Sequence, residues 1–351
     1  MYTKKNYTAF QMAWWTRFET FLFIIIISVW VALYHFLDLT WLKIPWTPLA
    51  LIGTAVAFVV GFQNNSAYDR IWEARKIWGG IVNTSRTFGM FVQDMITNEY
   101  ADKAMSDEFL QQEMKTLTYR HIAWMTALRR AMRTPKTWET AVNHRTNKEW
   151  DNKPPELNST LEEDIKHYIS KEDYLYVMSK DNKQTALLYL QSHHLKKLKE
   201  QGVLWEFSFL ELEAVLKDLF TLQGQSERIK NFPYPRQFAT LNHFFMWVFV
   251  LLLPLALVPQ FGEIGLEIAE QSPLIGKYFV WATIPFYVIV AWIFHTMERI
   301  GRTGENPFEG TANDVPISTL ARGIEIDLRQ NLGETKEEIP AQFPMKYNTQ
   351  F

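Results

Sequence analysis

Four apolar stretches without a charged residue constrain this chain more than any other feature of its sequence. They run over residues 21–34, 48–62, 244–258 and 278–294. Neutral flanking residues can extend each of them toward the roughly 20 residues with which a helix crosses a bilayer. A hydrophobic content of 48% would suit a soluble protein, but its concentration into four runs does not. We therefore expect an all-α membrane protein with four transmembrane helices per subunit.

Basic residues predict how these helices are oriented. Lysine and arginine cluster before residue 21, after residue 62 and after residue 294, whereas residues 261–276 hold three glutamates and no basic residue. Because cytoplasmic flanks of transmembrane helices are enriched in lysine and arginine, both termini are expected in the cytoplasm. No small-residue cleavage site follows the first apolar run, which favours a retained span over a signal peptide.

The polar parts of the chain predict a large domain outside the membrane. The expected organisation is an N-terminal segment with two spans at 1–63, a cytosolic helical domain at 64–236, two further spans at 237–298, and a cytosolic C-terminal helix and tail at 299–351. Prolines and polar residues predict an exposed loop at 134–159. Elsewhere in the cytosolic domain apolar residues recur at helical spacing, as do Leu212, Val215, Leu216, Leu219 and Leu222.

Prolines and a glycine predict local features near the end of the chain. Residues 317–332 carry apolar side chains close to a 3.6-residue period, which predicts a helix capped by Asp314, with Pro316 in its first turn and Gly333 as its stop. Pro254 and Pro285 lie inside the third and fourth apolar runs. Proline there should kink the helices locally, which neighbouring helices can tolerate.

The second apolar run continues into a charged segment without a break. Residues 49–78 contain no proline, although the sequence changes from membrane-grade hydrophobicity to dense charge after Phe62. This pattern predicts one helix that leaves the bilayer and enters water. Thr54, Phe58 and Phe62 recur every four residues, so they lie on one helix face. That face is a candidate pore lining; alternatively, the phenylalanines only pack against neighbouring spans.

A pore would give these side chains a physical role. A ring of phenyl groups is an apolar constriction that water leaves readily, so it can gate by dewetting. The ring edges carry partial positive charge that an anion can approach, and the Thr54 hydroxyl could add a hydrogen-bond donor. Because one chain offers a single such face, a pore requires several copies around a symmetry axis.

The sequence gives little support to other classes of function. A formal charge of −2 disfavours a nucleic-acid binder, and the absence of cysteine excludes disulfides and thiolate metal sites. We find no metalloprotease, serine-hydrolase or phosphate-binding motif. We therefore expect that the chain is not an enzyme and that it has neither a cofactor nor a metal site.

Three polar groups have ordinary structural interpretations. Asp69 and Glu73, four residues apart beside basic residues, are more typical of a salt-linked surface or subunit contact than of a catalytic acid pair. His193 and His194 point about 100° apart on a helix and are expected to be a solvated pair. The arginines within residues 129–133 could attract anions or anionic lipid, but a solvated helix face is the simpler interpretation.

Four motifs occur in order along most of the chain. They are Gly61-Phe62 followed by Tyr68-Asp69-Arg70-x-Trp72-Glu73-Ala74-Arg75, then Val82-Asn83-x-Ser85-Arg86, then Ser226-Glu227-Arg228-Ile229 ahead of Pro235, and Asn306-Pro307-Phe308 after the fourth span. With these motifs the chain resembles the bestrophin family of pentameric ion channels, particularly its bacterial members. The resemblance implies a homopentamer in the bacterial inner membrane, in contact with lipid, whose subunits surround a central pore for small monovalent ions.

The resemblance also assigns residues to the pore. The family's hydrophobic neck corresponds to Thr54, Phe58 and Phe62, the same face that the spacing identifies. Its second, cytosolic constriction corresponds to Phe207, with Leu210 as a second choice.

Two differences from the family pattern limit what carries over. The family commonly has a bulky aliphatic residue where this chain has Thr54, so this neck should be wetter at that level. In animal members an acidic run after the Asn-Pro-Phe motif binds calcium. Here that run is reduced to Glu309 and Asp314, too few for the roughly six to eight oxygen ligands of calcium.

The sequence thus predicts a pentameric channel with chloride as the default ion. A cation-conducting channel of the same fold is the main alternative, because a neck without fixed charge discriminates weakly between ions. A secondary transporter would usually contain repeated halves with broken helices, and no such repeat is visible. A membrane-anchored helical sensor is the third alternative.

Overall fold

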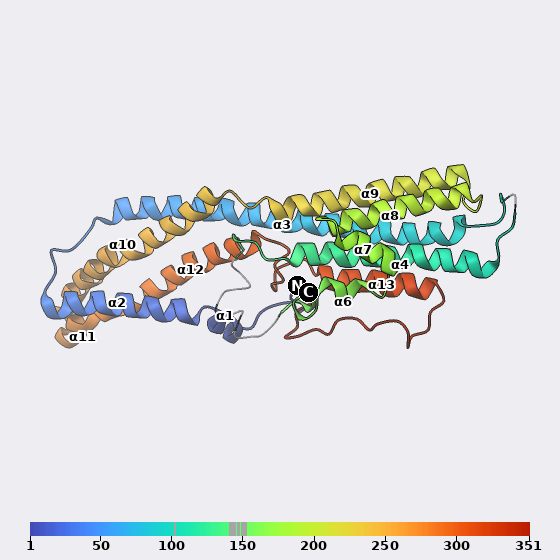
Figure 1. Cartoon of the computed structure of the whole chain (residues 1–351). Helices are drawn as coiled ribbons and strands as arrows, with labels where there is room; N and C mark the ends of the chain where they lie inside the picture. The colour runs from blue at the N-terminus through green and yellow to red at the C-terminus, as the bar shows by residue number, and fades with distance from the viewer. Residues whose placement is uncertain (102, 140–144, 146–147, 149–152) are drawn as a thin grey trace. The chain divides into compact units, whose positions relative to one another are not determined.

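The computed structural model describes residues 1–101, 103–139, 145, 148 and 153–351. Its helices are labelled in Figure 1 and form two compact units. We call residues 4–69 and 234–305 the membrane unit, and residues 1–3, 70–233 and 306–351 the helical unit. In chain order the elements are α1 (Ala9–Trp15), α2 (Arg17–Leu37), α3 (Trp46–Met95), α4 (Asp107–Arg133), η1 (Pro155–Asn158), α6 (Leu161–Ile165), α7 (Lys171–Met178), α8 (Lys183–Glu200), α9 (Glu206–Asn231), α10 (Arg236–Ala269), α11 (Pro273–Tyr278), η2 (Phe279–Ala282), α12 (Thr283–Gly304) and α13 (Ile317–Asn331).

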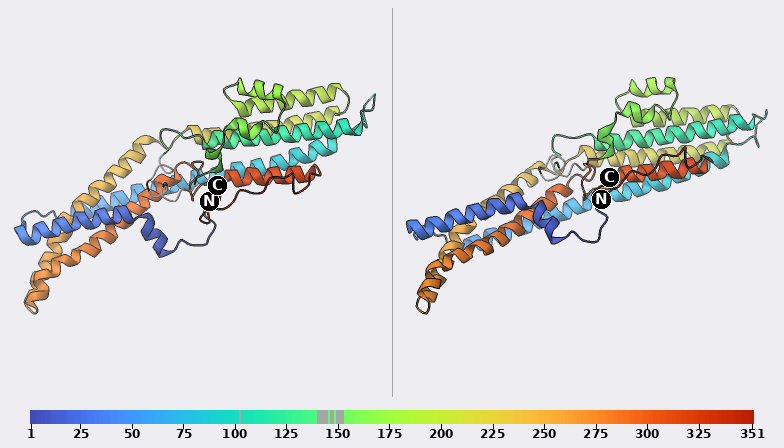
Figure 2. Two further views of the ribbon diagram at one scale, coloured as in Figure 1. Left: turned by 60° about the horizontal axis from the view of Figure 1, so that its bottom comes forward. Right: turned by 90° about the horizontal axis from the view of Figure 1, so that it is seen from below.

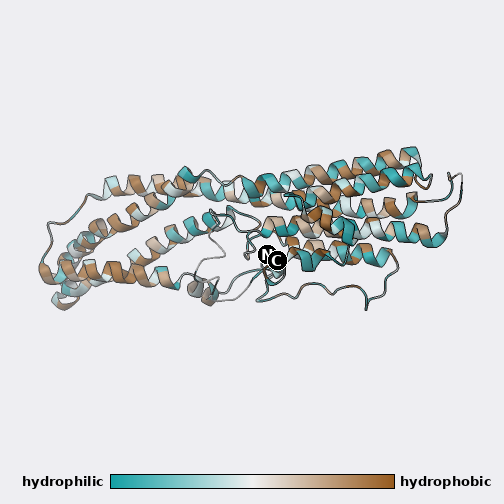
Figure 3. Ribbon diagram, in the orientation of Figure 1, coloured by the Kyte–Doolittle hydropathy of each residue, from teal (hydrophilic) through white to brown (hydrophobic). Residues whose placement is uncertain are grey.

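The four predicted spans are confirmed as long apolar helices. α2, α3, α10 and the segment from α11 to α12 are each long and apolar enough to cross a membrane. Figure 3 shows that apolar residues dominate the helices of the membrane unit, whereas the helical unit mixes apolar and polar residues along every helix. The all-helical membrane fold expected from the sequence is therefore confirmed.

The membrane unit has its own apolar core. α2 packs against α10 and α12, and α10 packs against α12. Phe23, Ile27 and Val31 of α2 recur every four residues and are fully buried, so they form one face toward the other helices. Other apolar side chains of α2, such as Phe21, are exposed. A soluble protein would not tolerate so much exposed apolar surface, but a membrane does.

Proline affects the two later spans differently. α10 runs through both Pro254 and Pro259. Pro285, however, is the third residue of α12, because the fourth span starts as α11 and the short 3₁₀ helix η2. Pro285 thus lies in the first turn of α12, where its missing N–H leaves no partner unsatisfied, and the change of helix type in the fourth span comes just before it.

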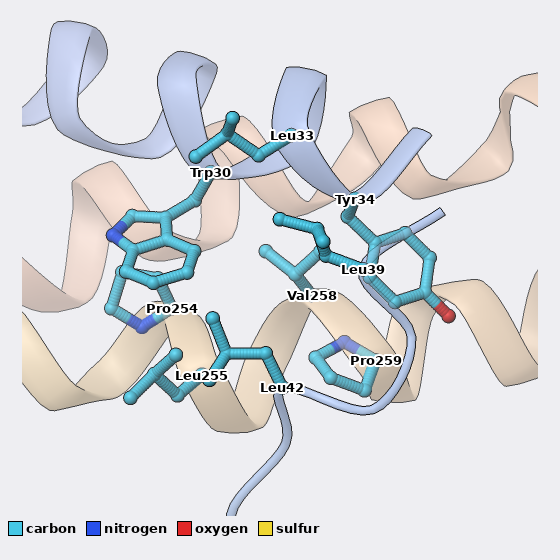
Figure 4. Close-up of a pocket in the computed structure, with 9 residues that line it drawn as sticks. All are labelled: Trp30, Leu33, Tyr34, Leu39, Leu42, Pro254, Leu255, Val258 and Pro259. Atoms are coloured by element: carbon cyan, nitrogen blue, oxygen red, sulfur yellow. The ribbon is translucent and has the colours of Figure 1, made fainter. Parts of the chain in front are cut away.

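A narrow crevice lies between α2, the chain that follows it, and α10 (Figure 4). Its volume of about 10 Å³ corresponds to about one water molecule. Its lining is almost wholly hydrocarbon and consists of Trp30, Leu33, Tyr34, Leu39, Leu42, Pro254, Leu255, Val258 and Pro259. We interpret the crevice as a packing gap beside the two prolines and not as a binding site.

The helical unit is a bundle around a second core. α4 packs against α8 and α13, and α8 packs against α9. Figure 2 shows the helices from two further sides. The charged half of α3 contributes Trp78, Ile81 and Phe88, which are fully buried. Both chain ends lie in this unit, where Tyr2 pairs with Thr349 in an antiparallel bridge.

Helix α13 confirms one prediction from the sequence and corrects another. The helix spans Ile317–Asn331, and Gly333 follows it with a positive φ of 82°, a conformation that glycine adopts at little cost. Asp314 does not cap this helix. Its carboxylate accepts hydrogen bonds from the backbone N–H groups of Gly310 at 2.6 Å and Thr311 at 2.9 Å, so it stabilises the preceding turn instead.

The basic cluster of α4 differs from expectation, as does one residue of the loop after it. Arg129 and Arg133 are buried, so the interpretation as a solvated helix face is wrong. Arg129 donates to Glu156 at 2.6 Å, and Glu156 in turn accepts from Ser318 of α13 at 2.6 Å. Glu156 belongs to the segment 134–159 that was predicted to be an exposed loop; residues 140–144, 146–147 and 149–152 of it lie outside the described residues.

Candidate pore neck on helix α3

Helix α3 confirms the prediction that one unbroken helix contains the change from apolar to charged sequence. It is continuous over Trp46–Met95. Residues 46–69 of this helix belong to the membrane unit, and residues 70–95 belong to the helical unit. Because the backbone hydrogen bonds of a helix are satisfied within the helix, it can pass from lipid to water without a break.

The two faces of the apolar half of α3 lie in opposite environments. Val56 and Val60 are only 3% and 2% exposed, whereas Phe58 and Phe62 are each 65% exposed. Phe58 is two residues from each valine and therefore lies about 200° around the helix from both. The face predicted from spacing thus points away from the core of its own membrane unit, and Thr54 on the same face is exposed as well.

The buried face of α3 is held close to its neighbour. A Cβ atom added to Gly53 would lie 2.7 Å from a ring carbon of Phe249 in α10, closer than side chains can approach. Phe249 is itself buried. Only glycine allows this contact, which fixes α3 against α10 one residue before Thr54.

The two phenylalanines form a continuous apolar surface. Their ring centroids are 6.3 Å apart and the rings are inclined by 38°, a common arrangement for an aromatic pair. Both side chains lack a polar or charged group. Such a surface within a membrane span can face lipid, another subunit or a pore, and in a narrow pore it would repel water.

Thr54 does not offer the free hydroxyl donor that was expected. Its Oγ1 donates to the carbonyl oxygen of Ala50, one helical turn earlier, at 2.9 Å. A threonine hydroxyl has a single proton. Since that proton is engaged by the backbone, the side chain presents lone pairs rather than a donor to whatever faces it.

A buried polar group directly follows the neck residues in the sequence. Gln63 is 1% exposed and lies on the packed side of α3. It donates to Glu305 at 3.0 Å and accepts from Asn242 of α10 at 3.0 Å, and Glu305 also pairs with Arg236. Sequence reasoning missed these residues, although a polar residue next to Phe62 on the buried side of a span was a usable signal.

The charged half of α3 forms structural contacts within the helical unit. Glu73 pairs with Arg228 of α9, and Arg70 donates to the carbonyl oxygens of Ile229 and Phe232 at 3.0 Å each. Glu73 therefore belongs to an ion pair, as expected, although its partner comes from a distant part of the sequence. α3 is thus linked to the end of α9 by three motif residues, Arg70, Glu73 and Arg228.

The two residues assigned to a cytosolic constriction lie on α9. Phe207 is in the first turn of the helix and is 62% exposed, and Leu210 follows one turn later with 54% exposed. The ring of Phe207 contacts Trp205, with centroids 4.7 Å apart. Both residues lie away from the buried face of α9, which includes Leu212 and Leu219.

Histidines in the helical unit have structural roles. His194 is not simply solvated, since it pairs with Glu113 at 2.5 Å. His121 is buried between the rings of Phe88 and Trp124, and burial lowers its pKa to about 3 because the charged form loses its hydration. Among the described residues, no three acidic or histidine side chains converge as metal ligands would.

A groove of about 340 Å³ lies on the helical unit between α4 and the start of α7. Its charged side chains and both tyrosines already have partners, including Lys115, which pairs with Glu334 at 3.3 Å. Arg120 pairs with Asp173 at 2.8 Å, while Tyr119 and Tyr168 donate to carboxylates of the C-terminal region. The groove therefore presents no uncompensated charge that would select a charged ligand.

The chain matches the sequence model of a known family over residues 17–330, described as the bacterial and fungal bestrophin protein. It is 26% identical over 300 residues to YneE, a voltage-dependent anion channel-forming protein from Escherichia coli, covering 86% of this chain and 80% of that protein. A voltage-dependent anion channel-forming protein from Ralstonia nicotianae is 26% identical over 302 residues, covering 86% of this chain and 81% of that protein.

The fold is similar to solved structures as well. A bacterial bestrophin homologue from Klebsiella pneumoniae superposes with a TM-score of 0.72 at 19% identity, covering 91% of this chain and 98% of that chain. The likeness extends over both units, and the family match spans every helix from α2 nearly to the end of α13. The chain therefore belongs to the bacterial and fungal branch of the bestrophin family.

Proposed function

We propose that this chain forms a homopentameric channel in the bacterial inner membrane and that small monovalent ions, chloride by default, pass its neck at Thr54, Phe58 and Phe62. The observation that carries the proposal is the exposed face of α3. Phe58 and Phe62 project from the membrane unit while Val56 and Val60, on the opposite face, are packed. The anion channel-forming function in the names of two relatives supports chloride.

Several subunits are needed to surround a pore. One chain contributes one neck face, and a closed ring of copies would bring five such faces to a common axis. Lipid surrounds the ring, and the termini and the domain at 64–236 lie in the cytoplasm, where Phe207, or alternatively Leu210, lines a second constriction. The exposed positions of both residues support this assignment.

The proposed neck controls conduction through hydration. Five copies of Phe58 and Phe62 would make a ring without fixed charge, which water leaves when it is narrow. An ion passes when the ring widens enough to rehydrate. Phenyl edges with partial positive charge favour an anion during this passage.

One observation favours the cation-conducting alternative. The hydroxyl of Thr54 donates its proton in a hydrogen bond to the Ala50 carbonyl oxygen, so the hydroxyl oxygen presents its lone pairs to the pore. Lone pairs can replace part of the hydration shell of a cation but repel an anion. Thr54 and the phenyl edges thus act in opposite directions on charge selectivity.

Current measurements with the purified protein in planar lipid bilayers test the proposal. With concentrated and dilute potassium chloride on opposite sides, the reversal potential should have the sign of the chloride equilibrium potential. A reversal potential with the sign of the potassium equilibrium potential would establish the cation channel instead. Discrete single-channel currents distinguish either channel from a transporter. Their absence from preparations that are pentameric by native mass spectrometry would refute the channel and leave the transporter or sensor alternatives.

A further inference from the structure

We infer that Glu305 is a positioning residue for the neck, acting through Gln63 on the rotation of α3; this inference rests on the proposed function. Glu305 is 2% exposed and immediately follows α12. One of its carboxylate oxygens accepts from Gln63 at 3.0 Å, and the other pairs with Arg236 in the first turn of α10. A single buried carboxylate therefore joins the end of α12 and the first turn of α10 to α3 at the point where the apolar half of α3 ends.

Gln63 is held at both ends of its amide. Its nitrogen donates to Glu305 and its oxygen accepts from the Asn242 side chain at 3.0 Å. Gln63 and Asn242 are 1% and 3% exposed, so losing either bond would leave a buried polar group without its partner. The amide can satisfy both neighbours only in one orientation, which fixes the side chain and the adjacent backbone of α3.

Close packing adds a second restraint at the same level. A Cβ atom on Gly301 of α12 would lie 2.6 Å from Oδ1 of Asn64 and 3.2 Å from Cγ of Gln63. The backbone of α12 therefore lies directly against these two side chains of α3. Rotation of α3 would drive them into α12 or pull them out of their hydrogen bonds.

The restraint matters because Phe62 has little support of its own. Its side chain is 65% exposed, and its described ring contact is with Phe58 of the same helix. Phe62 therefore follows the backbone of α3. Gln63 is the next residue, about 100° around the helix, so the orientation fixed at Gln63 also sets the direction in which the Phe62 ring projects.

Single-channel recordings of four variants test this inference. Gln63→Leu keeps the volume of the side chain but removes both hydrogen bonds, and we expect the open probability to rise about fivefold or more, because the loss of bonds to buried polar and charged groups is costly in the closed arrangement. Gln237→Leu, the same substitution at an exposed glutamine in the first turn of α10, should leave the open probability unchanged. Gln63→Glu places two carboxylates against each other and should also raise the open probability.

The fourth variant combines Gln63→Glu with Glu305→Gln. It exchanges the carboxylate and the amide, so that residue 305 donates to residue 63 while Asn242 and Arg236 keep their acceptors. We expect it to restore the native open probability. Failure of this exchange to rescue Gln63→Glu, in pentamers that assemble normally, would overturn the inference, and the result does not depend on whether Gln63→Leu folds.

A mutant cycle separates this inference from the proposed function. In a background with both Phe58→Ala and Phe62→Ala, Gln63→Leu should have little further effect, because both rings that turn with α3 are absent. An unchanged effect of Gln63→Leu in that background would show that Gln63 acts elsewhere and would overturn the inference while leaving the channel intact. If the native protein carries no current at all, the proposed function itself is refuted.

Discussion

At the scale of single residues, environment decides what a side chain can contribute. Arg129 and Glu156 are the kind of residues that usually cover a surface, yet both are buried and donate and accept within one network. Phe58 is the kind of residue that usually fills a core, yet it is 65% exposed. A buried ion pair needs partners of opposite charge, and an exposed phenylalanine in a span needs lipid, another subunit or a pore.

The first prediction concerns Phe58. Phe58→Ala should raise the open probability of the channel by about fivefold or more, because the smaller side chain removes apolar area from the ring and lowers the barrier to wetting. Phe36→Ala provides a matched control, since Phe36 is also exposed, at 70%, but lies near the end of α2 and outside the proposed neck. Equal gating in native protein and Phe58→Ala, measured by single-channel recording, would rule out this neck assignment.

At the scale of helices, the two faces of α3 have different roles. The buried face packs on α10 at Gly53 and carries Gln63, which is hydrogen-bonded to Glu305. The opposite face presents Thr54, Phe58 and Phe62. The close contact at Gly53 requires that no side chain be present. Substitution there should therefore move the whole helix and not only one residue.

The second prediction is that Gly53→Ala lowers the melting temperature of the detergent-purified protein. Placing a methyl group 2.7 Å from Phe249 forces a rearrangement that typically costs about 1–3 kcal/mol. Gly79→Ala is the control on the same helix, because nothing lies within 4 Å of its Cβ position and alanine is the better helix former. Tryptophan fluorescence follows both melts. A melting temperature for Gly53→Ala at or above that of Gly79→Ala would contradict the close contact.

At the scale of the whole molecule, the chain has two cores that need different surroundings. The membrane unit exposes apolar side chains along its spans and depends on lipid, whereas the helical unit has a large buried apolar core and polar residues along its helices. Two such cores need not unfold together. Conditions that act on one unit can therefore be used to assign its transition.

The third prediction uses this difference through pH. Burial lowers the pKa of His121 to about 3, whereas its unfolded value is about 6.5. Below pH 6.5 the unfolded chain binds a proton at His121 that the folded chain does not bind. The free energy of unfolding therefore falls as the pH drops below 6.5. Between pH 7.5 and pH 5.0 this loss should amount to about 2 kcal/mol.

Denaturant unfolding at the two pH values measures the effect. His121→Phe should reduce the acid sensitivity of the transition of the helical unit, while His193→Phe, at an exposed histidine, should not. Trp124, whose ring centroid lies 5.2 Å from that of His121, provides a local fluorescence signal. The same loss of stability in His121→Phe as in the native protein would contradict a buried neutral histidine.

Much of the fold could be predicted because it depends on local patterns. The four charge-free runs determined four membrane helices, since each must satisfy its own backbone hydrogen bonds in lipid. Continuity of α3 followed from the absence of proline, and the end of α13 followed from Gly333. The sequence also determined that Thr54, Phe58 and Phe62 share one face, because a helix repeats every 3.6 residues whatever surrounds it.

The tertiary structure decided which face is packed and which charges are buried. Spacing alone could not exclude that Phe58 fills a core, or that the arginines at 129–133 lie in water, because burial depends on partners far away in the sequence. The same applies to Gln63, Asn242 and Glu305, whose network joins residues 242 positions apart at its widest. Periodicity is a property of one helix, whereas packing and charge pairing are properties of several.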